Sequence, residues 1–514
     1  MRGALLVAGT HSDAGKSLVT AGLCRWLRRN EVSVAPFKAQ NMALNSIVAR
    51  GGLEIGRAQA MQAAAAGIEP EVGMNPILIK PSGDRHSQVI VMGRPYADVD
   101  AGSYQELKDE LRPIVAQALA DLRARYDVVV CEGAGSPAEI NLRAADLTNM
   151  GLARSADLPV ILVGDIDRGG VFASLLGTLA ALTPADQRHI AGFVINKFRG
   201  DYAILAPGLE QLHRLTGRPT LAVLPFVEGL GLDAEDSLAI DARPDLGGTS
   251  SAVTSARGST GTLDVAVVRL RWMSNFTDVD ALRLEPGVRA RFTRSALDIA
   301  RADLVVVPGT KATVSDLQRL RTDGLDAALI ARAGAGDPIL GVCGGYQMLG
   351  ESIADEVESG AGIVAALGLL PVRTAFAREK ILRTVCGHSG LLASTVGGYE
   401  IRHGRPAVHG GAPLIIAADG SPEGCASGAV LGTSWHGLLE HDDARRALLR
   451  WVAARRAIDF VPAPGVRFAC ERERRLDVLG DLVEAHMDTD RLRALIERGV
   501  PAGLPDLLLE LAPC

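Results

Sequence analysis

The segment that most constrains the fold is Pro338–Gly350, PILGVCGGYQMLG, with Cys343 at its centre. A short run of strand character leads into the cysteine and a glycine pair, and helical periodicity begins at Tyr346. This order predicts a nucleophile elbow, a sharp strand-to-helix turn that exposes a side chain at the top of a sheet. A helix N-terminus behind the cysteine favours the thiolate, which attacks carbonyl groups. The alternative is that Cys343 is a small buried apolar residue.

Two further stretches supply what a nucleophilic cysteine needs. The run Asp303–Lys311, DLVVVPGTK, predicts a buried strand that ends in a tight turn at Gly309. The backbone N–H groups of Gly309 and Gly344 are the predicted oxyanion donors. In GTSWHG, small residues surround His436, which can reach the thiol as a general base. The alternative is a structural histidine.

These motifs, PGTK, GVCGGYQMLG and GTSWHG, resemble a class I-type glutamine amidotransferase domain. The resemblance implies that a Cys343–His436 pair hydrolyses glutamine through a thioester and releases ammonia. The commoner amidotransferase pattern carries an acidic residue two positions after the histidine, whereas this chain has Leu438 there. Glu440 is then the nearby acid that could orient the imidazole.

Length and composition set the broad class. A chain of 514 residues exceeds the size at which a single core stops growing, so two or three domains are expected. A net charge of -6 gives no indication of nucleic-acid binding. The seven cysteines form no C-x-x-C pair, which disfavours a zinc site or a disulfide framework. Without a signal peptide or a membrane span in the sequence, a cytoplasmic protein is expected.

The N-terminus carries a phosphate-loop signature. An apolar strand at Ala4–Ala8 runs into GTHSDAGKS and then into an amphipathic helix to about Arg29. Such a loop holds phosphate oxygens with backbone N–H groups, while its lysine neutralises the transferring group and its serine ligates Mg²⁺. The loop is one residue longer than the common form and resembles that of dethiobiotin synthetase-like proteins. The predicted ATP-binding residues here are Gly9, Thr10, Asp13, Ala14, Gly15, Lys16 and Ser17.

Later strands end in further candidates for the same site. The apolar run YDVVVCEGAG ends at Glu132, which we expect to hold Mg²⁺ together with Ser17. The run AGFVINKFRGD ends with Asn196 and Lys197, a place where nucleotide enzymes contact or flank the base. Asp146 and Asp165 could serve the substrate or a second metal, and helix capping is the alternative.

The segment PFKAQNMALNS is predicted to be a loop beside the phosphate site. Carboxamides and a lysine suit recognition of a polar substrate that bears carboxylates. The alternative is a polar turn with a helix cap. The candidate substrate-binding residues of this segment are Lys38, Gln40, Asn41 and Asn45.

The order of these elements predicts an α/β chain with two doubly wound domains and a helical C-terminal tail. A P-loop domain with a parallel sheet is expected at 1–245, and a glutamine amidotransferase-like domain at 262–457. The small, polar stretch 246–261 is the predicted linker. Residues 458–514 form the predicted helical extension.

The whole chain resembles the cobyric acid synthase family. The resemblance rests on SDAGKS, PFKAQNMALNS, EIGRAQA, CEGAGSPAEINL, GDIDRGGVFASL, NKFRGD, SNFTD, PGTKATVSDL and GVCGGYQMLG. Arg402 stands where such enzymes often have histidine, and SWHG replaces a more usual tyrosine-leucine pair before HG. The resemblance implies that ATP and Mg²⁺ activate the b, d, e and g side-chain carboxylates of adenosylcobyrinic acid a,c-diamide. Ammonia from glutamine then amidates this corrinoid.

Two alternatives remain open. Within the same chemistry, the chain could be a cobyrinic acid a,c-diamide synthase, although PFKAQNMALNS favours the later enzyme. From another class, it could be a partition-type ATPase fused to a non-catalytic amidotransferase module. The presence of both Cys343 and His436 argues against that second alternative. A glutaminase assay would separate the two classes.

Overall fold

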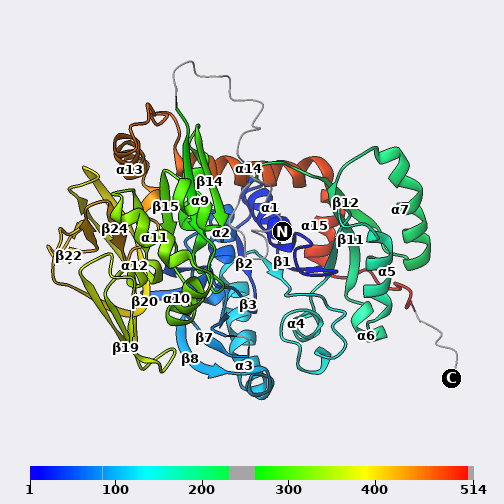
Figure 1. The fold of residues 1–514 in the computed structure, drawn as a ribbon. Coiled ribbons are helices and arrows are strands. Elements are labelled where there is room, and N and C mark those ends of the chain that lie inside the picture. The colour runs from blue at the N-terminus through cyan, green and yellow to red at the C-terminus, as the bar shows by residue number, and fades with distance from the viewer. Residues whose placement is uncertain (84, 231–260, 508–514) are drawn as a thin grey trace.

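The computed structural model describes residues 1–83, 85–230 and 261–507. Figure 1 shows two sheet-containing parts that lie side by side, and we call residues 1–230 the first half and residues 261–457 the second half. The predicted linker, 246–261, lies outside the described residues except for its last residue. Helices from the end of the chain lie across the first half (Figure 1).

The first half contains a parallel sheet in the order β12, β11, β10, β1, β9, β2. Its strands are β1 (Gly3–Gly9), β2 (Val34–Phe37), β9 (Val128–Glu132), β10 (Val160–Asp165), β11 (Ile190–Phe198) and β12 (Thr220–Pro225). Continuous apolar runs such as β1 suit a sheet that is buried on both faces. Because the strands are parallel, Gly9, Glu132 and Asp165 end at the same edge. The predicted doubly wound sheet is confirmed.

Helices cover the faces of this sheet (Figure 1). They are α1 (Lys16–Arg29), α2 (Arg57–Ala66), α3 (Ala101–Arg125), α4 (Met150–Ala156), α5 (Val171–Ala180), α6 (Pro184–Gln187) and α7 (Tyr202–Thr216). The apolar side of α1 enters the core, where Leu23 and Leu27 are fully buried. The predicted end of this helix, at Arg29, agrees with the structure.

A small side sheet includes part of PFKAQNMALNS, the segment that the sequence predicted to be a loop. Its strands lie in the order β3 (Gln40–Met42), β6 (Ile77–Pro81), β7 (Ser87–Val91) and β8 (Arg94–Val99). Asn41 faces Leu78 in the parallel pair β3–β6. A hairpin of β4 (Ser46–Ala49) and β5 (Leu53–Gly56) follows. The segment PFKAQNMALNS is therefore partly strand, because β6 supplies a pairing partner that is distant in sequence.

The second half also has a sheet of doubly wound type, in the order β14, β13, β15, β16, β24, β23. Only β23 is antiparallel to its neighbour among these strands. The strands are β13 (Leu263–Val268), β14 (Val288–Thr293), β15 (Leu304–Val307), β16 (Ile339–Val342), β23 (Cys425–Ser427) and β24 (Val430–Thr433). The helices are α9 (Ala296–Arg301), α10 (Thr313–Thr322), α11 (Leu325–Gly334), α12 (Gly344–Leu349) and α13 (Asp442–Arg455), with short 3-10 turns η3 (Phe276–Val279) and η5 (Leu438–Glu440).

A further sheet in the second half was not predicted. It is built around a long antiparallel hairpin of β19 (Val372–Ser389) and β20 (Ser394–Val408). Its other strands are β17 (Ser352–Asp355), β18 (Gly362–Ala365), β21 (Ile415–Ala417) and β22 (Pro422–Glu423). The hairpin reaches the first half, where Tyr399 and Ile401 pack against Val48.

The C-terminal extension is helical, as predicted, and packs on the first half. Its helices are α14 (Phe468–His486) and α15 (Thr489–Arg498), drawn in orange and red against α1 and β1 in Figure 1. Leu479 and Val483 join the apolar core on the α1 side. A Cβ atom placed on Gly22 would lie 2.9 Å from the carbonyl oxygen of Leu479, so glycine allows this close contact.

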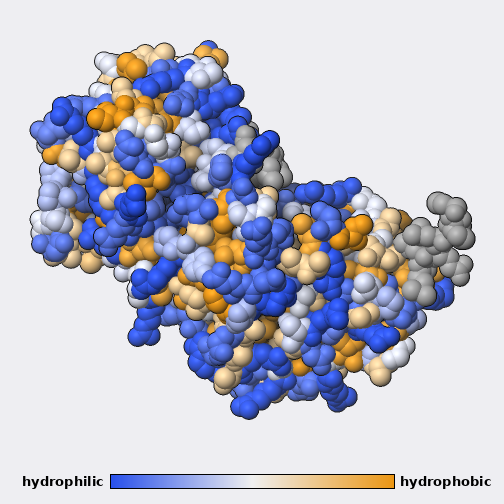
Figure 2. All heavy atoms as spheres, turned by 90° about the horizontal axis from the view of Figure 1, so that it is seen from below, coloured by the Kyte–Doolittle hydropathy of each residue, from blue (hydrophilic) through white to orange (hydrophobic). Residues whose placement is uncertain are grey.

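Within residues 1–83, 85–230 and 261–507, none of the helices combines the length and the apolar composition that crossing a membrane requires. On the face shown in Figure 2, hydrophobic residues are spread in small groups among hydrophilic ones.

Candidate active sites

Cys343 occupies a strained turn between β16 and α12. Its backbone angles are φ 50 and ψ -109, a region that L-residues rarely adopt. Its N–H donates to the carbonyl of Thr433 at 2.8 Å, which fixes the turn beside β24. A Cβ on Gly345 would lie 1.9 Å from the carbonyl oxygen of Val307, so only glycine fits there. The segment therefore has the strand–turn–helix form of a nucleophile elbow.

His436 follows β24 and lies beside this cysteine. Its Nδ1 donates to Oδ2 of Asp278 at 2.7 Å, and His436 lines the same cavity as Cys343. The N–H of Gly437 donates to the other oxygen of Asp278 at 2.9 Å. Burial lowers the pKa of His436, but the charges of Asp278 and Cys343 outweigh it and raise that pKa to about 10. These charges favour the imidazolium form of His436.

The sequence reasoning missed Asp278, and the role suggested for Glu440, orienting the imidazole of His436, was wrong. Asp278 belongs to η3 and to the motif SNFTD, which follows β13. The available signal was an acid in the segment after the carboxyl end of β13, ten residues beyond Val268, at an edge where ligand sites gather. Glu440 instead pairs with Arg57 of the first half at 2.6 Å. The second half therefore holds a Cys343–His436–Asp278 triad.

The two glycines predicted as oxyanion donors lie on either side of the pair. A Cβ on Gly309 would lie 3.0 Å from Cε1 of His436, and a Cβ on Gly344 would lie 2.7 Å from Cγ2 of Thr310. Gly344 is the first residue of α12, so its N–H has no acceptor within the helix. Their role in binding an oxyanion stays a prediction.

A cavity of about 40 Å³ opens onto Cys343 and His436. Most of its lining comes from the second half, but Lys80 of β6 reaches it from the first half. Lys80 and Lys380 both pair with Glu54, the latter at 2.6 Å, and the three side chains are buried. Burial lowers the pKa of Lys380 to about 8, although Glu54 opposes this. For Glu54, burial raises the pKa, yet the two lysines outweigh it and bring that pKa below its ordinary value.

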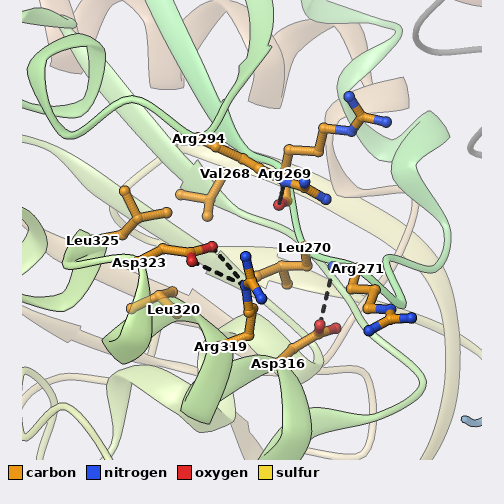
Figure 3. Close-up of a pocket in the computed structure, with 10 residues that line it drawn as sticks. All are labelled: Val268, Arg269, Leu270, Arg271, Arg294, Asp316, Arg319, Leu320, Asp323 and Leu325. Carbon is orange, nitrogen blue, oxygen red and sulfur yellow. Dashed lines mark hydrogen bonds and ion pairs between the residues drawn. The ribbon is translucent and has the colours of Figure 1, made fainter.

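A larger cavity, of about 220 Å³, lies elsewhere in the second half (Figure 3). Its arginines come from the ends of β13 and β14 and from α10, and they are Arg269, Arg271, Arg294 and Arg319. Arg319 pairs with Asp323 at 2.9 Å, and the backbone N–H of Arg271 donates to Asp316 at 3.0 Å (Figure 3). Because neither Cys343 nor His436 lines it, the larger volume does not mark the cysteine site.

The phosphate-loop residues are gathered at the carboxyl edge of the first sheet. Lys16 donates to the carbonyls of His11 and Gly135, each at 3.0 Å, and so lies along the inner side of the loop. Gly15 has φ 98, and a Cβ there would lie 2.0 Å from Nδ2 of Asn196. Glycine is therefore required at that position. Gly9, Thr10, Asp13 and Ala14 complete the loop between β1 and α1.

Asn196 and Lys197 contact the loop itself. Asn196 donates to the carbonyl of Ala14 at 3.0 Å, and Lys197 donates to the carbonyl of Asp13 at 3.0 Å. Lys197 also pairs with Asp165 at 2.6 Å. The end of β11 thus supports the phosphate loop, and a contact of these residues with a base stays a prediction.

Glu132 is fully buried and accepts hydrogen bonds on both oxygens. Ser17 and Lys38 donate to Oε1 at 2.8 and 2.9 Å, and Gln62 of α2 donates to Oε2. Burial raises the pKa of Glu132, but Lys38 and these donors outweigh it and lower that pKa. A serine hydroxyl and an ionised carboxylate in direct contact are the hard oxygen donors that Mg²⁺ prefers.

The Ser17 hydroxyl and the Glu132 carboxylate can supply part of a Mg²⁺ site whose remaining ligands are not protein side chains. Within the ranges that the structure describes, no cluster of three His, Cys, Asp or Glu side chains suits a metal. Mg²⁺ usually takes one or two protein oxygens and fills its shell with water and substrate phosphates. Ser17 and Glu132 match that pattern.

The predicted substrate residues are largely engaged inside the first half. Exposed fractions are 2% for Lys38 and 1% for both Asn41 and Asn45. Asn41 donates to Gln59 at 2.9 Å, and Tyr104 donates to Gln40. Lys38, Gln40 and Asn41 thus bond to other residues of the first half, and direct contact of the predicted residues with substrate stays a prediction.

Two aspartates make mainly local bonds. Asp146 accepts from the backbone N–H groups of Thr148, Asn149 and Gly151 at 2.8 to 3.0 Å, which ties down the start of α4. The helix-cap alternative describes this geometry. Asp165 pairs with Lys197, as above, and accepts from the N–H of Asp167 at 2.9 Å. The structure gives neither aspartate a contact that requires a substrate, so that role stays a prediction.

Family models match both halves of the chain, and curated relatives match it over almost its whole length. A model described as a CobQ/CobB/MinD/ParA nucleotide binding domain matches residues 5–239. Another, described as a CobB/CobQ-like glutamine amidotransferase domain, matches residues 264–444. Cobyric acid synthase of Streptomyces avermitilis is 58% identical over 98% of this chain and 98% of its own length. That of Frankia casuarinae is 57% identical over 98% of this chain and 99% of its own length.

Proposed function

This chain belongs to the cobyric acid synthase family, and on that basis we propose that it amidates a corrinoid with ATP and glutamine. The substrate is adenosylcobyrinic acid a,c-diamide, and the b, d, e and g side-chain carboxylates become amides to give adenosylcobyric acid. The observation that best supports glutamine hydrolysis is the buried Cys343–His436–Asp278 arrangement. Cys343 is the nucleophile, His436 the proton donor, and Asp278 the carboxylate that orients the imidazole.

The glutaminase step follows from these three side chains. The Cys343 thiolate attacks the side-chain carbonyl of glutamine, and the N–H groups of Gly309 and Gly344 stabilise the oxyanion. His436 gives its proton to the departing nitrogen, so ammonia leaves and a thioester remains. A water molecule, deprotonated by His436, then attacks the thioester and releases glutamate and the free thiol. Asp278 holds the imidazole in the tautomer that serves both transfers.

The synthetase step uses the phosphate loop. A carboxylate is a poor acyl donor, and transfer of the γ-phosphoryl group of ATP makes it an acyl phosphate with ADP as the leaving group. Lys16 stabilises the transferring charge, and the loop N–H groups hold the phosphates. Ser17 and Glu132 would hold Mg²⁺, which shields phosphate charge when bound. Ammonia then displaces phosphate and leaves an amide.

We also propose a division of labour along the chain. Residues 1–245 carry the synthetase site and residues 262–457 the glutaminase site, with 246–261 as the connection. Residues 458–514 form an extension whose helices α14 and α15 complete the core of the first half. The packing of Leu479 and Val483 on α1 supports this assignment.

The decisive experiment compares two nitrogen sources. Cys343→Ala should abolish amidation with glutamine but retain amidation with ammonium salts at high pH, because only the thioester step needs the thiol. Product formation from the corrinoid diamide is measured for each source, and cobyrinic acid serves as the competing substrate. Equal loss with both nitrogen sources would contradict the proposed division of labour. Turnover of cobyrinic acid alone would indicate a,c-diamide synthesis instead.

A further inference from the structure

The helix α2 begins with an arginine that reaches the second half. The Arg57 side chain is 4% exposed and pairs through Nη2 with Oε1 of Glu440 at 2.6 Å. Its Nη1 donates to the hydroxyl of Tyr399 at 3.3 Å. A planar guanidinium can hold two acceptors in fixed directions, which an ammonium group does less well. Arg57 therefore fixes Glu440 and Tyr399 relative to the first half.

Tyr399 lies directly on the catalytic histidine. The rings of Tyr399 and His436 are stacked, with centroids 5.4 Å apart and planes at 24°. Their backbones exchange two hydrogen bonds, at 3.1 and 2.9 Å. A Cβ on Gly398 would lie 1.9 Å from the carbonyl oxygen of His436, so this strand has no space to shift toward it. The Arg57 contact is thus one side chain away from the imidazole.

The loop that carries Asp278 is also held by the first half. The backbone N–H of Ser46, at the start of β4, donates to Oδ1 of Asn275 at 2.9 Å. Asn275 has φ 50 and lies three residues before Asp278. The N–H of Arg57 in turn donates to the carbonyl of Asn45 at 3.1 Å. The same corner of the first half therefore supports both partners in the His436–Asp278 pair.

The other side of α2 touches the phosphate site. Gln62 donates to Oε2 of Glu132 and, at 3.4 Å, to the carbonyl of Ser17. Gln62 is five residues after Arg57, so the two positions are separated by about 7.5 Å along the helix axis. Both residues belong to the same ten-residue helix. One short helix thus contacts the proposed Mg²⁺ ligands and the support of the glutaminase triad.

We propose that α2 couples the two active sites, with Arg57 as a positioning residue for His436 and Gln62 as the contact that responds to the nucleotide. Gln62 donates to the same carboxylate that Ser17 contacts, so engagement of Ser17 and Glu132 by phosphate and metal changes what that carboxylate offers to Gln62. A displacement of α2 then alters how Arg57 holds Tyr399 and Glu440. Glutamine hydrolysis therefore depends on the state of the ATP site. This inference rests on the proposed function.

The test measures glutamate release with and without ATP and Mg²⁺, together with ammonium-dependent amidation. Wild type should release glutamate faster when ATP and Mg²⁺ are present. In Arg57→Met, we expect glutaminase kcat/KM to fall about tenfold or more, with most of the nucleotide response lost. Ammonium-dependent amidation should stay within about threefold of wild type, which also shows that the variant is folded.

Arg25→Met is the matched control. Arg25 is also a buried arginine that joins distant parts of the chain, since it pairs with Glu473 and Asp477 of α14 at 2.9 and 2.7 Å. It contacts neither Tyr399 nor Glu440 through these bonds, so glutaminase activity and its nucleotide response should persist. If Arg25→Met loses both as Arg57→Met does, general weakening of the fold explains the effect and the proposal is overturned.

Two further readouts separate positioning from bulk stability. Arg57→Lys keeps one cation near Glu440, so it should recover part of the glutaminase rate and part of the nucleotide response that Arg57→Met loses. Gln62→Met should keep glutamine hydrolysis without ATP near the wild-type rate but lose its response to ATP and Mg²⁺.

Several results overturn the proposal. They are a nucleotide-independent wild-type glutaminase, an Arg57→Met variant with the wild-type rate and response, no recovery in Arg57→Lys, and a full nucleotide response in Gln62→Met. Failure of the proposed function would look different, because the wild type would then release no glutamate at all, or Cys343→Ala would release it as fast as the wild type whatever happens at Arg57.

Discussion

Asp278→Asn is the substitution that tests the glutaminase triad most directly. Asparagine has nearly the same shape as aspartate, but it carries no charge and its amide nitrogen cannot accept a hydrogen bond. In the native arrangement, the two carboxylate oxygens accept from Nδ1 of His436 at 2.7 Å and from the N–H of Gly437 at 2.9 Å. The substitution therefore removes the charge that stabilises the imidazolium while leaving the fold of η3 in place.

The size of the effect follows from the pKa of His436. Its value of about 10, against an ordinary 6.5, reflects the charges of Asp278 and Cys343 acting against burial. A tenfold change in a protonation constant corresponds to about 1.4 kcal/mol, so these interactions exceed the opposing effect of burial by an order of 5 kcal/mol. Without Asp278, burial lowers the pKa of His436. We expect the rate of glutamine hydrolysis to fall by about 10²–10⁴-fold, as when other triads lose the charge of their acid.

The lower pKa of His436 also determines the direction in which the pH profile of glutamine hydrolysis shifts. Activity at high pH ends when the imidazolium loses its proton, so a lower pKa of His436 moves the alkaline limb of kcat/KM to lower pH. The assay is glutamate release across about pH 6 to 10. Asp280→Asn is the control, because Asp280 lies in the same loop and faces Arg283 at 4.0 Å. An Asp278→Asn rate within tenfold of wild type, with an unshifted alkaline limb, would refute the reasoning.

Three other expectations concern different parts of the molecule. Glu54→Gln leaves the buried Lys80 and Lys380 without their shared carboxylate, so the free energy of unfolding should fall by about 3–5 kcal/mol. An unchanged urea unfolding midpoint would contradict this. Gly398→Ala places a Cβ 1.9 Å from the carbonyl oxygen of His436, so glutaminase should fall about 100-fold while ammonium-dependent synthesis persists. Lys16→Ala should remove synthesis with either nitrogen source, and its survival with ammonium would refute the phosphate-loop assignment.

The local sequence pattern was enough to predict both parallel sheets and the two turns that carry chemistry. Apolar runs such as β1 and β15 end in glycine-bearing turns, and these features are encoded by consecutive residues. The elbow at Cys343 was predictable for the same reason, because its strand, strained residue and helix all lie within thirteen letters of the chain.

Features that depend on distant partners were not predictable. His436 and Asp278 are 158 positions apart, so nothing local connects them, and Glu440 is closer in sequence although it pairs with Arg57. The bond of Lys38 to Glu132, 94 positions away, was not predictable for the same reason, and its contact with substrate stays a prediction. The β19–β20 hairpin was missed because its strands are buried over only part of their length. Many of its residues are half-buried or exposed, so the sequence carries no continuous apolar run there.

The docking of α14 and α15 has a consequence for biosynthesis of the chain. The core beside α1 includes Leu476, Leu479 and Leu492, which leave the ribosome hundreds of residues after β1. The first half therefore cannot finish its hydrophobic core during its own translation. A product truncated before Phe468 would display the apolar side of α1 as an exposed surface that chaperones and proteases recognise. A chain able to consume ATP is thus completed only after the part that supplies ammonia has been synthesised.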